Sequence, residues 1–288
     1  MLNEPQTNLS VTDFSVSFDT AEGVYVAGQS VSGQVSVTVA SQIQVHTLTM
    51  CVYGAGEAKW TKKESQNGSA AKRKEIWLNE NVPMIKNSTP LTEGKHEIAF
   101  KARLPPNLLS SIEAKHGSVR YTCNAALVFN CPGSDTQYNV VARRGFTVVR
   151  RVDINKRQAQ LQPLAKSESK TLGFCSCTSG RIRYNLSMAR TAYVAGEGLP
   201  ISGRIENKSA GRIERAAAVL QMHIDFHGNE TSETLRETID VSEEVLGFYL
   251  DPDSSTKIDR NFAIPALVPS SPALSKCNNN YVLRNAVF

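Results

Sequence analysis

Two pairs of potential metal ligands stand out among the reactive side chains. Cys175 and Cys177 have the spacing of half a structural zinc site, but the sequence offers no second pair at ligand spacing, and four ligands are needed. His223 and His227 would meet on a helix, yet residues 218–226 alternate as a strand, along which four residues span about 13 Å. We therefore expect no metal and no cofactor. The thiols are interpreted as structural or inert, and the histidines as surface or strand residues.

The local signatures of an enzyme are missing from the sequence. It contains no glycine-rich phosphate loop, no Gly-x-Ser-x-Gly elbow and no paired His–Cys signature. Aspartate and glutamate are scattered through expected loops, so no acid–base constellation can be assembled from them. We therefore predict that the protein is not an enzyme and that it has no catalytic residues.

Basic residues flank a Ser, Asn and Gly stretch at 65–70, which predicts a hairpin loop between strands ending near Trp60 and beginning near Ile76. Basic side chains are attracted to anionic bilayers. We expect weak binding of anionic lipid or phosphate by six residues: Lys59, Lys62, Lys63, Lys72, Arg73 and Lys74. A solvated loop is the alternative, since charge runs usually are solvated. The pairs Arg143–Arg144 and Arg150–Arg151 are interpreted as loop and strand-edge charges near a domain joint.

Length and composition bound the class of protein. The chain has 288 residues, of which 41% are hydrophobic and 20% charged, and this fits two globular domains. A net charge of +5 is mild, so no nucleic-acid binding is expected. The polar N-terminus predicts no signal peptide, and no apolar run approaches the ~20 residues of a membrane span. A cytoplasmic protein with six reduced cysteines is expected.

Apolar residues alternate with polar or small ones in many short runs. The clearest run covers residues 31–39, and similar runs occur at 48–52, 121–129 and 182–188. A period of two places one set of side chains on one face of a strand, which must then pack on a second sheet. Gly, Pro, Asn and Ser punctuate these runs, and no long helical pattern occurs. The fold class predicted is all-β, with tandem immunoglobulin-like antiparallel sandwiches.

The chain repeats itself, which predicts two copies of one domain. Tyr25-Val26-Ala27-Gly28 precedes a Ser-Gly strand pattern around Gly33, and Tyr193-Val194-Ala195-Gly196 precedes the same pattern around Gly203. Gly28 and Gly196 suit a turn with positive φ, whereas Gly33 and Gly203 suit a bulge or a close backbone approach. The expected divisions are a first domain at 10–152, a connection at 153–171 and a second domain at 172–288.

Several motifs, in this order and spacing, resemble the alpha-arrestins of the arrestin superfamily. They run from about Phe14 to Tyr281 and comprise the Tyr25 and Tyr193 turns, Gly54 to Trp60, Gly94-Lys95-His96, Phe100 to Pro105, Gly117 to Tyr121, Cys175-x-Cys177 and Asn207-Lys208-Ser209. The most distinctive is the inter-domain joint element, Val152, Asp153, Ile154 and Asn155. The resemblance implies tandem arrestin domains.

The resemblance also implies an adaptor in membrane protein trafficking, endocytosis and ubiquitin-dependent sorting. Its expected partners are membrane cargo proteins (receptors or transporters), a ubiquitin ligase and other arrestins, and the basic segment adds an anionic membrane surface. Its expected location is the cytoplasm, with recruitment to the plasma membrane or endosomes. A retromer-type coat subunit and an extracellular adhesion-like sandwich are the alternatives.

Family members recruit ligases through Pro-Pro-x-Tyr motifs, which dock into WW domains. The one adjacent proline pair here, Pro105-Pro106, is followed by Asn107 and Leu108, so the tyrosine is missing. The ligase is therefore expected to be reached indirectly. The second domain also ends about one hairpin early, so it is expected to be truncated.

Overall fold

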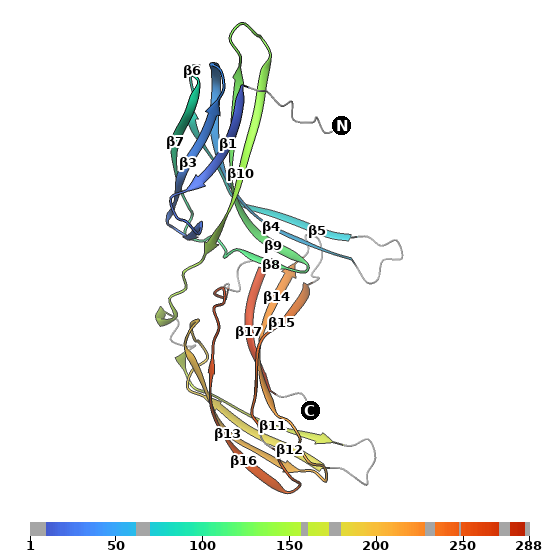
Figure 1. Ribbon diagram of the computed structural model, residues 1–288. Coiled ribbons are helices and arrows are strands. Elements are labelled where there is room, and N and C mark those ends of the chain that lie inside the picture. Colours follow the sequence, from blue (N-terminus) through green and yellow to red (C-terminus); the bar gives the residue numbers. More distant parts are fainter. Residues whose placement is uncertain are drawn as a thin grey trace. The chain divides into compact units, whose positions relative to one another are not determined.

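The computed structural model describes residues 10–61, 70–156, 161–172, 180–227, 234–247, 249–270 and 277–285 (Figure 1). Across these ranges the chain is built mainly of β-strands, and a short 3-10 turn, η1 (Ile154–Lys156), follows the first unit. Among the described residues there is no helix with the length and apolar character needed to cross a membrane. The chain divides into two compact units. Most residues up to Arg151 belong to the first unit, and most residues from Val152 onward belong to the second. The predicted all-β class with tandem sandwiches is confirmed.

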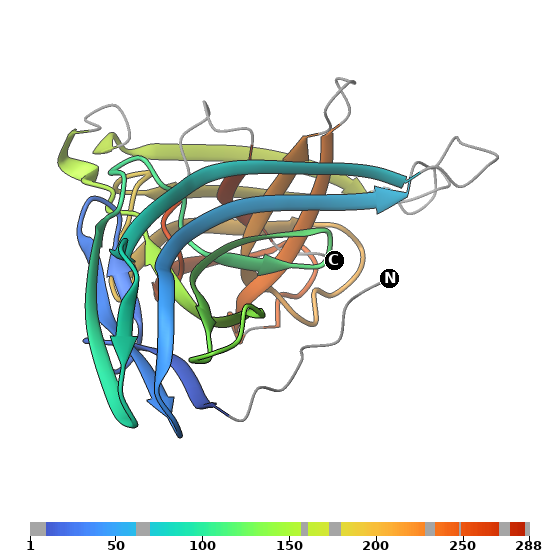
Figure 2. The same cartoon turned by 90° about the horizontal axis from the view of Figure 1, so that it is seen from above.

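The first unit contains two sheets. The smaller sheet has the order β1-β3-β7, and the larger has the order β2-β10-β9-β4-β5, with β6 paired to β4 and β8 to β9. Within the larger sheet β2 runs parallel to β10. Figure 2 shows the long strands β4 and β5 curving side by side. The bounds are β1 (Val11–Phe18), β2 (Val24–Val26), β3 (Ser30–Val39), β4 (Ile43–Thr61), β5 (Ala70–Ile85), β6 (Thr89–Leu91), β7 (Gly94–Arg103), β8 (Ile112–Ala114), β9 (Gly117–Asn130) and β10 (Gln137–Val149).

Because apolar and polar residues alternate along the strands, the core of this unit lies between its two sheets. Val31, Val35 and Val37 of β3 are fully buried, while Ser32, Gln34 and Ser36 face outward. Aromatic rings link the two sheets, since the ring of Phe18 on β1 lies 5.9 Å from that of Phe146 on β10 in an edge-to-face arrangement. Such ring pairs stabilise a core beyond the area that they bury.

The second unit also has two sheets. One has the order β11-β12-β13-β16, and the other has the order β15-β14-β17. Ile182, Ile201, Ile258 and Leu250 belong to one apolar cluster that forms the core. The bounds are β11 (Leu164–Leu172), β12 (Gly180–Met188), β13 (Gly198–Lys208), β14 (Ala217–His227), β15 (Thr234–Val245), β16 (Ser254–Ala263) and β17 (Cys277–Asn285).

Equivalent glycines occupy the same place in both units. Gly33 on β3 lies opposite Phe18 and Phe100, and Gly203 on β13 lies opposite Leu186 and Ile258. A Cβ added at either glycine would meet a backbone carbonyl of a paired strand, β1 or β12, at 1.9–2.0 Å. The glycines therefore allow a close backbone approach, as the sequence predicts.

The turns before these strands match as well. Gly28 has a φ of 90° and Gly196 a φ of 86°. In the first turn the amide of Gln29 donates to the carbonyl of Val26 at 3.0 Å, and in the second Glu197 donates to Val194 at 3.1 Å. The internal repeat predicted from the sequence is thus present in the hydrogen bonding and the register of both units.

Two strand positions differ from the sequence expectations. Residues 164–172 form β11 and pair along β12, so a strand lies inside the segment expected to be a connection. Strand β5 begins at Ala70 rather than near Ile76. Residues 164–172 and the first residues of β5 do not show the apolar alternation on which the expectations were based. They are strands because they pair with a neighbouring strand, and not because one face is buried.

Candidate functional site

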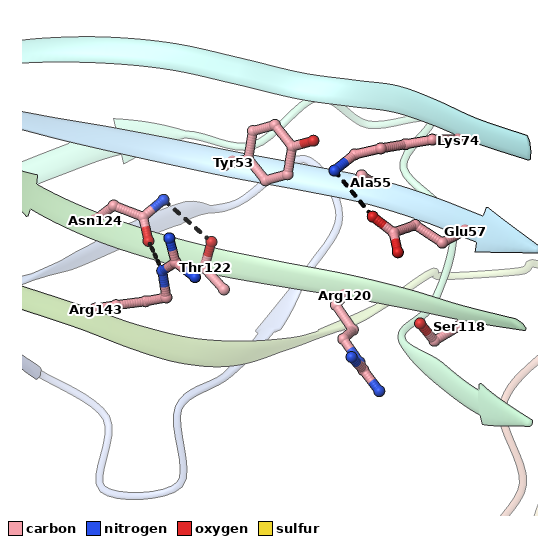
Figure 3. A pocket seen from close by; sticks show the side chains of 9 residues that line it. All are labelled: Tyr53, Ala55, Glu57, Lys74, Ser118, Arg120, Thr122, Asn124 and Arg143. Atoms are coloured by element: carbon pink, nitrogen blue, oxygen red, sulfur yellow. Dashed lines mark hydrogen bonds and ion pairs between the residues drawn. The ribbon is translucent and has the colours of Figure 1, made fainter. Parts of the chain in front are cut away.

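Outward-facing residues of four strands in the first unit line a polar pocket of about 400 Å³ (Figure 3). Even-numbered residues of β9 point away from the core, since its odd-numbered residues from Val119 to Phe129 are buried. The strands β4, β5, β9 and β10 lie side by side, which gathers these side chains on one face. The lining residues are Tyr53, Ala55, Glu57, Lys74, Ser118, Arg120, Thr122, Asn124 and Arg143.

A lysine–carboxylate pair forms one side of this pocket. Lys74 Nζ lies 2.9 Å from Glu57 Oε1 and 5.5 Å from the centre of the Tyr53 ring. The hydrogen bond to Glu57 raises the pKa of Lys74. Both charged side chains are about half exposed, so solvent screens the pair and its contribution to stability is small.

An arginine held by an amide forms the other side. Arg143 Nε donates to Asn124 Oδ1 at 2.8 Å, and Asn124 Nδ2 donates in turn to Thr122 Oγ1 at 3.3 Å. Within the described part of the chain, Arg143 forms no ion pair. The Asn124 contact orients the guanidinium while its terminal nitrogens remain able to donate to a bound carboxylate or carbonyl.

Arg120 completes the charged groups of the pocket. Its Nε and one terminal nitrogen donate to the two carboxylate oxygens of Glu113 at 2.6 and 2.7 Å. These hydrogen bonds lower the pKa of Glu113. The pocket therefore combines a partnered arginine, a partnered lysine and Arg143, a composition suited to binding polar peptide groups.

Three hydroxyl groups are among the polar groups that line the pocket. The hydroxyl groups of Tyr53, Ser118 and Thr122 have no histidine among the other lining residues that could accept a proton. Among the described residues, no group of three or more His, Cys, Asp or Glu could hold a metal ion. The groups that line the pocket can form hydrogen bonds and ion pairs.

The predicted basic segment lies mostly in strands rather than in a loop. Lys59 is on β4, and Lys72, Arg73 and Lys74 are on β5, with Lys59 directly opposite Lys72 in the register. Arg73 and Lys74 are already paired, with Glu75 at 3.2 Å and Glu57 at 2.9 Å. Lys62 and Lys63 lie outside the described residues. The pocket thus shares only Lys74 with this segment.

The joint motif adopts a defined local structure. Val152 and Asp153 precede the 3-10 turn η1, and the amide of Asn155 donates to Asp153 Oδ1 at 3.1 Å. A carboxylate that accepts from an amide two residues later forms an Asx turn. This contact explains why the motif has Asp at its second position, and the functional role expected of the joint stays a prediction.

The structure describes some of the histidines and cysteines that the sequence offers as possible metal ligands. His223 and His227 both lie on β14, as predicted, and the ring of His223 is buried with Nδ1 2.9 Å from Thr238 Oγ1. Cys175 and Cys177 lie outside the described residues. Of the thiols that are described, Cys123 is buried, and burial raises its pKa to about 12.

Sequence reasoning missed most of the pocket. Arg143 was interpreted as a loop or strand-edge charge, and it lies within β10 opposite Asn124, where β10 pairs with β9 and not with β2, whose pairing covers only Thr147–Val149. A signal was present in the alternation of Arg120, Thr122 and Asn124 with buried residues of β9. The pairing of β9 with β4 and β10 could not be obtained from that alternation.

Taken together, the strand order, the duplicated turns and the sandwich cores define an arrestin-type tandem β-sandwich protein. The sequence pattern of the arrestin (or S-antigen) N-terminal domain matches residues 14–155, and that of the arrestin C-terminal domain matches residues 178–284. The chain belongs to the arrestin family, among the arrestin domain-containing proteins, or alpha-arrestins.

Individual relatives match over most of the chain. Arrestin domain-containing protein 4 of Mus musculus is 28% identical over 265 residues, which cover 88% of this chain and 61% of the relative. Arrestin domain-containing protein 17 of Caenorhabditis elegans is 26% identical and covers 92% of this chain and 64% of its own length. Arrestin domain-containing protein 5 of Homo sapiens is 24% identical, with shares of 94% and 80%. The chain therefore spans less than two thirds of the length of the first two.

Proposed function

We propose that this chain is an adaptor that binds cytosolic segments of membrane cargo proteins for endocytosis and ubiquitin-dependent sorting. The observation that carries the proposal is membership of the arrestin domain-containing proteins over both domains. The pocket supports it, because its groups suit recognition and not catalysis. Location in the cytoplasm with recruitment to the plasma membrane or endosomes, an indirectly recruited ligase and association with other arrestins belong to the same proposal.

In this proposal the pocket around Arg143 receives a polar side chain of the cargo segment. Because Arg143 is held by Asn124 and has no carboxylate partner in the part of the chain that the structure describes, it is the group best placed to bind an incoming carboxylate. A charge-assisted bond of this kind contributes about 1.5–3 kcal/mol. Binding should therefore depend on Arg143 more than on Arg120, whose guanidinium is already paired with Glu113.

Peptide arrays of cytosolic segments from receptors and transporters test this. We expect Arg143→Gln to weaken binding of the captured segments about tenfold or more, as loss of a charged hydrogen bond implies. Arg103→Gln, an exposed cation on β7, is the matched control and should bind like the wild type. If the two variants bind equally, the pocket is not the cargo site. If the array captures no segment at all, the adaptor proposal itself fails.

We further propose that the basic segment contributes weak binding to anionic lipid. Its members remain Lys59, Lys62, Lys63, Lys72, Arg73 and Lys74. Each cation near an anionic surface is worth about 1 kcal/mol, and salt screens the attraction. A variant with all six positions changed to Gln should float less with phosphatidylserine vesicles at low salt, and unchanged flotation would refute the proposal.

A further inference from the structure

The solvent-facing side of the sheet β11-β12-β13-β16 carries a group of cations with no role in the core. Ile182, Ile205 and Ile258 point into the apolar cluster, so their strand neighbours point outward. Glu206 and Asp259 are the acidic residues at the outward positions of these paired strands. The outward cations, here named the C-sheet basic face, are Arg181, Arg183, Arg204, Lys208 and Lys257, and all five are exposed.

Like charges lie directly opposite each other on this face. Arg181 is the register partner of Lys208, and Arg204 is the register partner of Lys257. Directly opposed like charges destabilise an antiparallel sheet. Lys208 Nζ is 3.5 Å from Asp253 Oδ1, but these side chains are 50% and 84% exposed, so the pair offsets little. Arg183 lies opposite Glu206, and Arg204 donates to Ser255 Oγ at 2.9 Å, but the two opposed cation pairs leave a net positive charge that an external anion would stabilise.

The first unit shows that the fold does not require these charges. Aligning Gly33 with Gly203 and following the strand registers gives the outward position that corresponds to each cation. Gln34, which lies opposite Ala99, corresponds to Arg204, which lies opposite Lys257. Ser15 corresponds in the same way to Arg183, and Thr38 to Lys208. Four cations of the second copy thus stand where the first copy has neutral residues.

We propose that the C-sheet basic face docks on an anionic membrane surface. Its cations lie on three adjacent strands, so they spread in two dimensions, about 13 Å along the strands and about 10 Å across them. A linear acidic peptide would cover one row of such a face, whereas a layer of lipid headgroups covers all of it. Small residues such as Ser169, Ser187 and Ser202 occupy outward positions beside the cations, and Glu206 lies between Arg204 and Lys208 on β13.

The contact is electrostatic. The outward positions of these strands contain no large apolar side chain that could insert into the bilayer. Attachment is therefore reversible and depends on salt. This role goes beyond cargo binding, because it holds the second domain at a bilayer whether or not a cargo segment is bound to the first.

The variant Arg183→Ser, Arg204→Gln, Lys208→Thr, Lys257→Ala copies the residues of the first copy and therefore tests the face without introducing side chains foreign to the fold. Co-sedimentation with phosphatidylserine-rich vesicles should fall about tenfold or more relative to wild type, since each cation contributes substantially near the surface. The control variant Lys86→Gln, Lys95→Gln, Lys101→Gln, Arg103→Gln loses the same charge from exposed positions of the first unit and should keep most of its binding.

Several results would overturn the proposal. One is vesicle binding by the face variant that equals the binding of wild type. A second is an equal loss of binding in the control variant, and a third is wild-type binding that does not depend on salt or on phosphatidylserine. Capture of soluble polyglutamate without any vesicle binding would also overturn it and would indicate an acidic protein instead. Thermal unfolding of the variant Lys208→Thr, Lys257→Ala gives a second readout, because it removes one member of each opposed like-charge pair and should leave the midpoint of the second domain unchanged or raise it. A lowered midpoint would show that the cations serve the fold.

Discussion

Asn207 is a fully buried side chain that ties three backbone segments of the second unit together. Its Nδ2 donates to the carbonyls of Gly211 at 2.7 Å and Leu250 at 3.0 Å, and its Oδ1 accepts from the amide of Ser209 at 3.0 Å. A buried amide with every polar atom partnered fixes the end of β13 against the segment before β16. This gives the Asn-Lys-Ser motif a physical role.

Replacing Asn207 by Ala should destabilise the second domain by about 2–3 kcal/mol. The loss leaves the carbonyls of Leu250 and Gly211 with fewer donors in a buried place, and unsatisfied buried groups are costly. Denaturant unfolding monitored by fluorescence or circular dichroism measures the change. Asn185→Ala, an exposed position on β12, should shift the unfolding free energy by no more than about 0.5 kcal/mol. Equal effects of the two substitutions would contradict the role assigned to Asn207.

At the scale of elements, the close approach of β1 to β3 depends on one residue. A Cβ at Gly33 would lie 1.9 Å from the carbonyl oxygen of Ser17, so the strand pair must separate or shift to accept it. The repeated Gly203 has the same contact, with the carbonyl oxygen of Asn185 at 2.0 Å. The repeat thus preserves a backbone contact and not only a sequence motif.

Gly33→Ala should destabilise the first domain by about 2 kcal/mol or more, since overpacking against backbone forces it to move. Gly145→Ala is the matched control in the same domain, because the nearest atom to its added Cβ is the carbonyl oxygen of Tyr121 at an ordinary 3.8 Å. The control should leave the unfolding midpoint nearly unchanged. Comparable midpoints for the two variants would argue against the close approach.

The elements also show which features a sequence reveals. Strands with one buried face, such as β3 and β9, were predicted because their apolar residues alternate. Strand β11 was missed because every residue from Leu164 to Thr171 is exposed, so no alternation marks it. The pocket was missed for another reason. It combines β4, β5, β9 and β10, and the register that brings Arg143 opposite Asn124 is a property of pairing between distant segments.

At the scale of the whole molecule, two copies of one fold carry different surfaces. The first copy has the polar pocket on its larger sheet, and the second has the C-sheet basic face on the sheet that corresponds to β1-β3-β7. Divergence of outward residues on a preserved core is how a duplicated domain acquires a second function. In our account the first copy selects the cargo and the second holds the bilayer.

Proximity biotinylation in living cells, with a biotin ligase fused to this chain, tests the central claim most directly. An adaptor should label integral membrane receptors or transporters together with endocytic and ubiquitin ligase components, and the labelling should rise when a cargo protein is co-expressed. Arg143→Gln should reduce the cargo-dependent part. Labelling of a fixed set of soluble subunits at constant ratio, independent of any membrane protein, would contradict the account and indicate a coat subunit.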